Sequence, residues 1–278
     1  MRSKIWLGVG LVVVTGSAAA AQPVAERAAI TSVAPSGLAL AAADTVKALP
    51  AGQGGEGGEA GAAANLDAKS DAAYAASLAE IKALVMLSAA LVSAHDGAAA
   101  SERLQHAQDE VYSRVAASFE ARKTSPFADE LNALIAATKG EKDRFFTAQG
   151  ALLKRIAAAE PAAPGGKAPI NQTVAVLIGL LKSAAVEYGE ALDGKTVKSL
   201  PEYQYTYAFV HAAAGTLEEA RTALAAKDAA ALKAVSDGIA TLTAAVAGVV
   251  PAPKTLIASD AFSALVSRIE LKASRFTN

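Results

Sequence analysis

Apolar residues recur at alternating intervals of three and four residues in this chain, and this spacing limits the fold more than any other feature. The clearest stripe consists of Ile170, Val174, Leu177, Leu181, Ala184 and Tyr188. Such intervals place side chains on one face of an α-helix, whereas a half-buried β-strand alternates with a period of two. The stripe therefore predicts a helix that buries one face against neighbouring helices.

The same spacing continues through most of the sequence after residue 66, and the composition favours the same conclusion. Ala accounts for 72 of the 278 residues, whereas aromatic residues make up only 5%. Abundant Ala with few aromatic residues favours helix over sheet. We therefore expect an all-α fold, an up-and-down bundle of about seven helices over residues 67–276.

Proline, glycine and capping residues mark the ends of the predicted helices. The first helix contains Tyr74 to Val92, the second spans residues 98–123, and the third runs from Pro126 to Ile156. Three prolines and two glycines in residues 161–169 interrupt the helices, so this segment is a candidate boundary between two parts of the bundle. The helices after the fourth are expected to start at Pro201, at the N-cap Asp228 and at the cap Ser259.

The first 21 residues have the pattern of a signal peptide. Arg2 and Lys4 precede an uncharged apolar run at residues 5–14, and Ala19 and Ala21 are placed as in an A-x-A cleavage site. The run is shorter than the roughly 20 apolar residues that a membrane-spanning helix needs. We expect cleavage after Ala21, a periplasmic location and a mature chain without a transmembrane segment. An uncleaved anchor is the alternative.

Residues 22–66 are expected to be a low-complexity, mostly disordered linker. Gly, Ala and Glu dominate residues 51–65. Such a composition cannot bury enough apolar surface to offset the entropy lost on folding.

The charge balance and the cysteine content exclude several function classes. There are 26 Lys and Arg against 27 Asp and Glu, so the basic surplus of a nucleic-acid binding protein is missing. The chain has no Cys, which excludes disulfides, thiolate metal ligands and cysteine nucleophiles. Paired acidic residues are sequence neighbours, which do not face each other on a helix. We therefore expect no nucleic-acid partner, no catalytic residues and no enzymatic activity.

Residues 189–196, GEALDGKT, match the G-x-x-x-x-G-K-[ST] pattern of phosphate-binding loops. That loop needs a strand before it and a helix after it, so that free amides reach the phosphate. Here a helical stripe precedes the segment, and Glu190 and Asp193 would repel phosphate. We interpret the segment as the end of a helix closed by Gly194.

His106 and Glu110 are four residues apart on the second predicted helix, so they share one face. An imidazole and a carboxylate at this spacing can bind the same cation. The alternative is a solvated polar face that also holds Arg103 and Ser113.

Further potential ligands gather around the turn between the fourth and fifth helices. An antiparallel hairpin would bring Glu187 close to Glu202, and tyrosines with a histidine follow at intervals of four residues. Iron accepts carboxylate, imidazole and phenolate ligands, so these side chains could form a metal site. The alternative is that the aromatic side chains only pack in the core. The predicted metal is iron or copper, and the predicted ligands are His106, Glu110, Glu187, Glu202, Tyr203, Tyr207 and His211.

The same turn also carries a resemblance to known proteins. The stretch with Glu187-Tyr188, Asp193-Gly194 and Glu202-Tyr203 resembles the exported helical domain that precedes the membrane part of bacterial iron permeases. It is also similar to uncharacterised proteobacterial exported all-helical proteins, in which an earlier helix carries H-P-x-x-E-x-Y. Residues 106–112 fit that pattern with Ala107 in place of Pro. The resemblance implies an exported helical protein associated with iron uptake, without the permease's membrane helices.

Two functions follow from these observations. One is a periplasmic protein that binds iron or copper, or presents it to an uptake system, and whose predicted ligands converge. The other is a non-catalytic cell-envelope interaction or scaffold protein without a ligand, with a contiguous apolar patch larger than the few hundred Å² usual for monomers. An envelope or transport protein is the expected partner in both cases.

Overall fold

The computed structural model of the chain describes residues 70–160 and 168–278. The predicted signal peptide (1–21) and the predicted linker (22–66) lie outside the described residues. The same holds for most of the candidate boundary segment.

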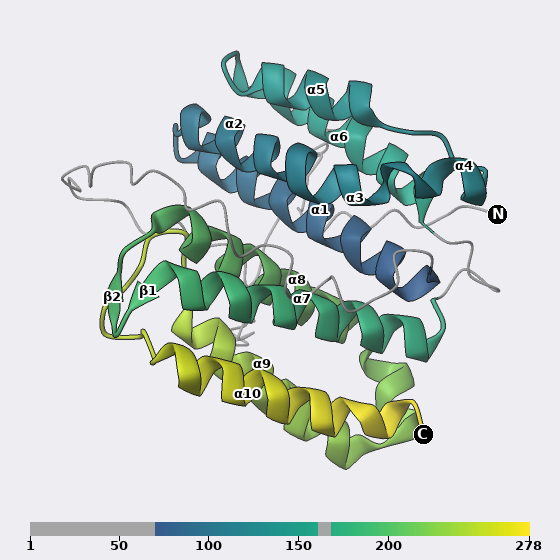
Figure 1. Cartoon of the computed structure of the whole chain (residues 1–278), viewed down its shortest axis with the longest axis vertical. Coiled ribbons are helices and arrows are strands. Elements are labelled where there is room, and N and C mark those ends of the chain that lie inside the picture. Colours follow the sequence, from purple (N-terminus) through teal and green to yellow (C-terminus); the bar gives the residue numbers. More distant parts are fainter. Residues whose placement is uncertain (1–69, 161–167) are drawn as a thin grey trace, which may run out of the picture. The chain divides into compact units, whose positions relative to one another are not determined.

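Residues 70–160 form the N-terminal half of the described fold, which begins with the long helix α1, Asp71–Ser93 (Figure 1). Ser70 caps this helix, because its hydroxyl accepts a hydrogen bond from the Ala73 amide. The following elements are α2 (Gly97–His106), the π-helix η2 (Ala107–Tyr112), α3 (Ser113–Ala116), α4 (Ser118–Arg122), α5 (Ala128–Ala137) and α6 (Lys142–Ala159).

Residues 168–278 form the C-terminal half. Asp228 caps α9 as predicted, since its carboxylate accepts a hydrogen bond from the Ala231 amide at 2.9 Å. The cap of the last helix is Ala258, so Ser259 is its first residue and not the predicted cap. The elements are α7 (Ile170–Ala191), β1 (Leu192–Asp193), β2 (Thr196–Val197), α8 (Leu200–Lys227), α9 (Ala229–Ala245), α10 (Ser259–Ala273) and the 3₁₀-helix η4 (Ser274–Phe276).

The predicted all-α fold is confirmed, but two predicted helices differ in detail. The predicted helix from Pro126 to Ile156 consists of α5 and α6, with a turn around Gly140 between them. Glycine has a low helix propensity, which explains the interruption. The predicted helix over residues 98–123 contains the π-helix η2 and ends at Lys123, whose φ of 53° is left-handed.

Helices α1, α7 and α8 join the two halves. Helix α7 packs along α8 and also contacts α1 and α10, while α1 contacts α2, α7 and α8. Figure 1 shows α1 between α2 and α7. Leu84 of α1 and Leu181 of α7 are fully buried in one continuous core. Because burial of each such side chain contributes about 1.5–3 kcal/mol, this core holds the halves together.

By length and composition alone, α1 and α7 are long and apolar enough to cross a membrane. The most apolar stretch of α1 is 78% buried inside the fold, and that of α7 is 33% buried. The core helix of a soluble protein passes the same test, so the apolar character of α1 is accounted for by its place in the core.

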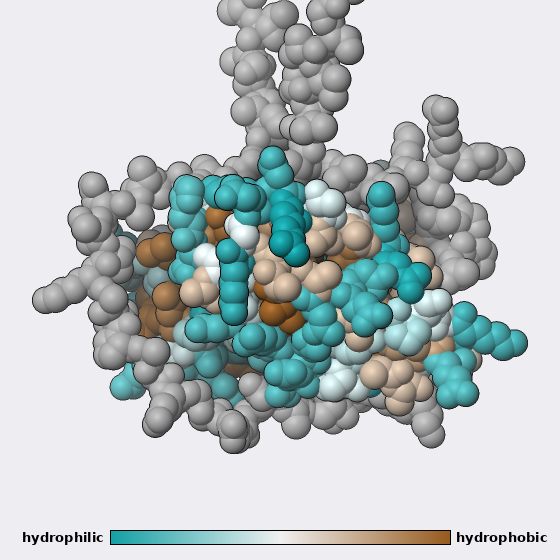
Figure 2. Space-filling view, turned by 90° about the horizontal axis from the view of Figure 1, so that it is seen from above, coloured by the Kyte–Doolittle hydropathy of each residue, from teal (hydrophilic) through white to brown (hydrophobic). Residues whose placement is uncertain are grey.

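The face of the molecule in Figure 2 mixes hydrophilic side chains with smaller apolar areas. The exposed large apolar side chains of the described residues come from three helices and the loop after α9: they are Phe146, Leu200, Val250 and Leu271. On the face in view, no single apolar patch dominates the described residues.

Candidate functional site

A row of polar side chains on α2, η2 and α3 meets residues of α1, α7 and α8. The row includes Arg103, His106 and Arg114. The π-helix η2 lies between His106 and Arg114, and its wider turn changes the direction in which the following side chains project. Such turns are rare and occur frequently at functional sites. We call the region where this row meets α1, α7 and α8 the polar junction.

Arg103 and His106 both contact the beginning of α8. Arg103 is only 5% exposed, and its Nε donates a hydrogen bond to Gln204 Oε1 at 3.0 Å. The His106 ring stacks on the Tyr205 ring with centroids 4.3 Å apart. Burial, and then the charges of Arg114 and Arg103, lower the pKa of His106 to about 4. His106 is therefore neutral at physiological pH, which is the form in which imidazole binds metals.

Glu80 supplies a buried carboxylate to the polar junction. Its side chain accepts a hydrogen bond from Arg114 Nη2 at 2.6 Å and another from Ser183 Oγ at 2.7 Å. Burial raises the pKa of Glu80, and both partners counteract this rise. Since the three residues come from α1, α3 and α7, this group links the N-terminal half to the C-terminal half.

The two predicted carboxylate ligands of the α7–α8 hairpin lie near Tyr205. Burial chiefly raises the pKa of the Tyr205 phenol, Arg103 lowers it, and the charges of Glu187 and Glu202 raise it further. Glu202 Oε2 is buried and has no hydrogen-bond partner among the described residues. An unpaired buried carboxylate oxygen is unfavourable, so a cation or donor that reaches Glu202 would relieve this cost.

The next three predicted ligands of α8 lie in the C-terminal half, where Tyr203 and Tyr207 are buried and His211 is half-buried. Tyr203 is 0% exposed, and burial raises the pKa of its phenol to about 12, with further contributions from Tyr188 and Tyr207. The His211 ring packs on the Tyr207 ring with centroids 4.2 Å apart. The Nε2 atom of His211 lies 3.4 Å from the carbonyl oxygen of Val246, on the loop after α9.

The seven predicted ligands therefore divide into groups. One group consists of His106, which stacks on Tyr205, and of Glu187 and Glu202, whose charges raise the pKa of the Tyr205 phenol. The other consists of Tyr203, Tyr207 and His211, and Glu110 lies half-buried on η2. Within residues 70–160 and 168–278, no three His, Cys, Asp or Glu side chains are arranged to hold a metal ion. The structure does not gather all seven into one cluster, and the metal-binding role of each residue stays a prediction.

The GEALDGKT segment forms a β-hairpin. Strands β1 and β2 pair antiparallel, with Asp193 opposite Thr196, and Gly194 takes a φ of 62° in the two-residue loop. Hairpin loops of this length favour residues with positive φ, which glycine adopts without strain. Gly194 therefore serves a hairpin turn, and the expectation that it closes the helix is corrected. The end of α7 is closed by the backbone amides of Lys198 and Ser199, which donate hydrogen bonds to the Ala191 carbonyl oxygen.

Five residues of the polar junction escaped the sequence analysis: Glu80, Arg114, Ser183, Gln204 and Tyr205. The alternative interpretation of the second predicted helix placed Arg103 on a solvated face, whereas it is buried. The available signal was Glu80, a carboxylate in the middle of a mostly apolar helix. Such a residue is rarely buried without a charged or hydrogen-bonding partner, so its position indicated a polar contact with another helix.

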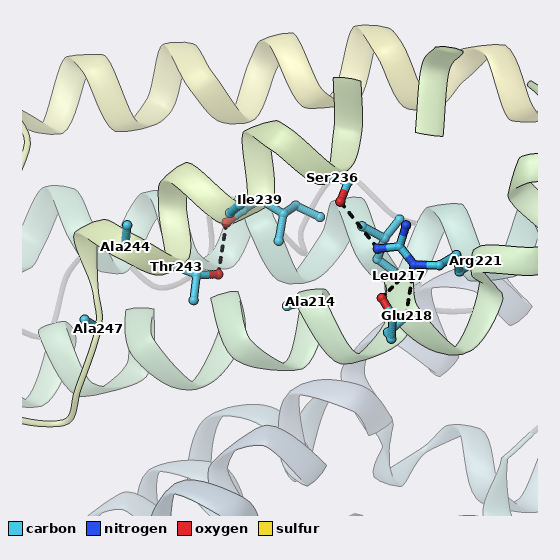
Figure 3. Close-up of a pocket in the computed structure, with 10 residues that line it drawn as sticks. Ala214, Leu217, Glu218, Arg221, Ser236, Ile239, Thr243, Ala244 and Ala247 are labelled. Carbon is cyan, nitrogen blue, oxygen red and sulfur yellow. Dashed lines mark hydrogen bonds and ion pairs between the residues drawn. The ribbon is translucent and has the colours of Figure 1, made fainter. Parts of the chain in front are cut away.

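A shallow groove of about 450 Å³ lies between α8 and α9 (Figure 3). Its walls are mainly Ala side chains together with Leu217 and Ile239. At one end, Arg221 Nε donates to both carboxylate oxygens of Glu218 at 2.8 and 2.9 Å, and Arg221 Nη2 donates to Ser236 Oγ at 3.4 Å. The two charged lining residues of the groove therefore pair with each other.

Comparison with known families identifies the C-terminal half. Residues 167–278 match the iron permease-associated four-helix bundle domain. The match covers α7, α8, α9 and α10, and it includes the hairpin that carries Glu187 and Glu202. The resemblance to the domain that precedes iron permeases is thereby confirmed for these residues. Neither the curated proteins nor the solved structures contain a match to the chain.

Proposed function

We propose that this protein is an exported, non-catalytic component of an iron-uptake system, which binds iron or copper or presents it to a transport protein. The observation that carries the proposal is the match of residues 167–278 to the iron permease-associated four-helix bundle domain. The signal-peptide pattern of residues 1–21 supports export to the periplasm. A transport protein of the cell envelope is the partner that this domain type suggests.

The polar junction supports a metal-binding role. Glu187 and Glu202 are hard oxygen donors near Tyr205, and one oxygen of Glu202 lacks a partner. His106 stacks on the same tyrosine, and its neutral imidazole is available as a nitrogen donor. Binding at this place would require these side chains to move together, because no three of them are arranged around one point among the described residues.

Calorimetric titration of the purified protein with iron and copper salts tests metal binding. We expect stoichiometric binding that is lost in a Glu187→Gln/Glu202→Gln variant. A Glu120→Gln/Glu141→Gln variant is the matched control, since it removes the same charge from exposed positions in the N-terminal half. Binding that survives in the first variant, or is equally weakened in the control, would assign the metal to other residues.

Uptake of radioactive iron by cells grown under iron limitation tests the wider proposal. We expect cells that lack the protein to take up iron more slowly, and the wild-type protein to restore the rate. An unchanged rate would count against any role in iron uptake.

A second function is an interaction component without a ligand, in which the matched domain contacts an envelope or transport protein. Slower uptake in cells without the protein, combined with no metal binding by the purified protein, would support this function over metal presentation.

A further inference from the structure

The exposed Leu271 of α10 is surrounded by basic side chains. It is 69% exposed, more than any other large apolar side chain of the described residues. Arg268 lies three residues before it and Arg275 four residues after it, so both project from the same side of the helix, and Lys272 follows it directly. A single exposed leucine is ordinary on a protein surface, so the cations around Leu271 are what distinguish it.

The cations around Leu271 are in excess because the neighbouring acidic side chains are already paired. Asp228 accepts a hydrogen bond from Arg275 Nε at 2.7 Å, and Glu270 accepts one from Lys182 Nζ at 2.6 Å. The Arg275–Asp228 pair joins the end of α10 to the turn between α8 and α9, so Lys227 belongs to the same end of the bundle (Figure 1). Three exposed cations form no ion pair with the described residues: they are Lys227, Arg268 and Lys272. We call these three, together with Leu271 and Arg275, the basic patch.

We propose that the basic patch attaches the protein to a bilayer that contains anionic phospholipids. Leu271 enters the boundary between headgroups and acyl chains, while the basic side chains contact the headgroup phosphates. Long basic side chains suit this position, because their apolar stems lie along the acyl region and their charges stay in the headgroup region. Such attachment is peripheral and reversible. The inference goes beyond the proposed function, since it concerns where the protein is held and not what it binds.

Charge and shape favour a lipid surface over a folded protein partner. The basic patch has a surplus of three unpaired positive charges, so a complementary surface is anionic. Protein interfaces are built around a core of several apolar side chains that pack into pockets, whereas this patch offers only Leu271. One protruding apolar side chain among cations matches the boundary of an anionic bilayer. The predicted periplasmic location would bring the patch within reach of a membrane surface.

Co-sedimentation with phospholipid vesicles tests the inference on the whole protein. The vesicles contain either phosphatidylcholine alone or equal amounts of phosphatidylcholine and the anionic phosphatidylglycerol. We expect binding only to the anionic vesicles, and weaker binding as the salt concentration rises, because salt screens exposed charges. Arg268→Gln/Lys272→Gln should weaken this binding about thirty-fold, since each cation near such a surface contributes about a factor of five. Lys139→Gln/Lys154→Gln is the matched control, because it removes two exposed cations from the N-terminal half.

Leu271→Ser separates the apolar contribution from that of the charges. It should weaken binding and keep the salt dependence of the wild type, whereas Arg268→Gln/Lys272→Gln should reduce that dependence. All the substituted side chains are exposed, so the unfolding temperatures of the variants should match that of the wild type. A loss of binding in a variant that unfolds like the wild type is therefore a loss of contact with the lipid.

Several results would overturn the inference. They are no binding to anionic vesicles, equal binding to both kinds of vesicle, and an equal loss in the Lys139→Gln/Lys154→Gln control. Binding that is unchanged in Arg268→Gln/Lys272→Gln would assign the contact to another segment, such as the apolar run at residues 5–14. Binding to soluble polyglutamate but not to anionic vesicles would indicate an acidic protein partner instead. These outcomes are independent of the proposed function, which is judged by metal titration and by iron uptake in cells.

Discussion

The half-buried His106 predicts a loss of stability when the protein is acidified. Its pKa is lowered from 6.5 to about 4 in the folded protein, mainly by burial and then by two arginines. A group with a lowered folded-state pKa contributes stability that is present above the unfolded pKa and is lost as the pH falls toward the folded pKa. Each unit of difference between the folded and unfolded pKa corresponds to about 1.4 kcal/mol, so the lowered pKa of His106 corresponds to about 3 kcal/mol of unfolding free energy.

The perturbation that tests this reasoning is His106→Phe, which keeps an aromatic ring next to Tyr205 but binds no proton. Urea unfolding is measured in steps from pH 6.5 down to pH 4, the range set by the two pKa values. Other groups titrate alike in both proteins, so the wild type should lose up to about 3 kcal/mol more than the variant across this range.

His95→Asn provides the control for this measurement, because it removes an exposed imidazole at a position with a φ of 64° that asparagine also tolerates. This control should keep the pH profile of the wild type. Parallel profiles for the wild type and His106→Phe would refute the reasoning, because they would mean that folding does not oppose protonation of His106.

Three further predictions concern the packing of the fold, each measured by urea unfolding at neutral pH. Arg114→Ala leaves the Glu80 carboxylate buried without its cation and should cost about 3 kcal/mol of unfolding free energy. Glu80→Gln should cost less, because the Arg114 side chain that it leaves without a partner can reach solvent. Equal costs for the two variants would contradict this. Gly238→Ala should cost about 1–3 kcal/mol of unfolding free energy, because the added Cβ would lie 2.6 Å from a side-chain carbon of α10. Gly150→Ala, whose added Cβ would have nothing within 4 Å, should instead stabilise the protein by roughly 0.5–1 kcal/mol. The reverse order of the two variants would show that α9 and α10 are not packed as described. Tyr188→Phe should cost about 1–3 kcal/mol and increase hydrogen exchange in the loop between α9 and α10, since its hydroxyl bonds to that backbone; unchanged exchange would argue against this contact.

Features set by residues close together in the chain could be predicted from the sequence. The stripe of α7 is buried as its spacing predicted, and the Asp228 cap has the predicted hydrogen bond. Both depend on local rules, namely helix periodicity and the need of the first amides for an acceptor. The match to the iron permease-associated domain was foreseen for the same reason, because the motif residues that indicated it, between Glu187 and Tyr203, lie close together in the chain.

Features that depend on distant residues could not be predicted. The Glu80 carboxylate bonds to Arg114 and Ser183, which are 34 and 103 residues away in the sequence. The alternative interpretation placed Arg103 in solvent because its position on an isolated helix looked polar, yet Gln204 of α8 covers it. The division of the predicted ligands into groups has the same origin, since spacing along one helix does not determine which neighbouring helix each side chain meets.

The contact of α1 with α7 and α8 has a consequence for how the matched domain behaves on its own. Helix α1 contacts α7 and α8 and belongs to the same chain. Its effective concentration at the surface that it covers is therefore high and does not depend on the protein concentration. A fragment with only residues 168–278 would lack α1 and would expose the apolar surface that α1 covers. Such a fragment should self-associate as its concentration rises, unless another apolar helix takes the place of α1.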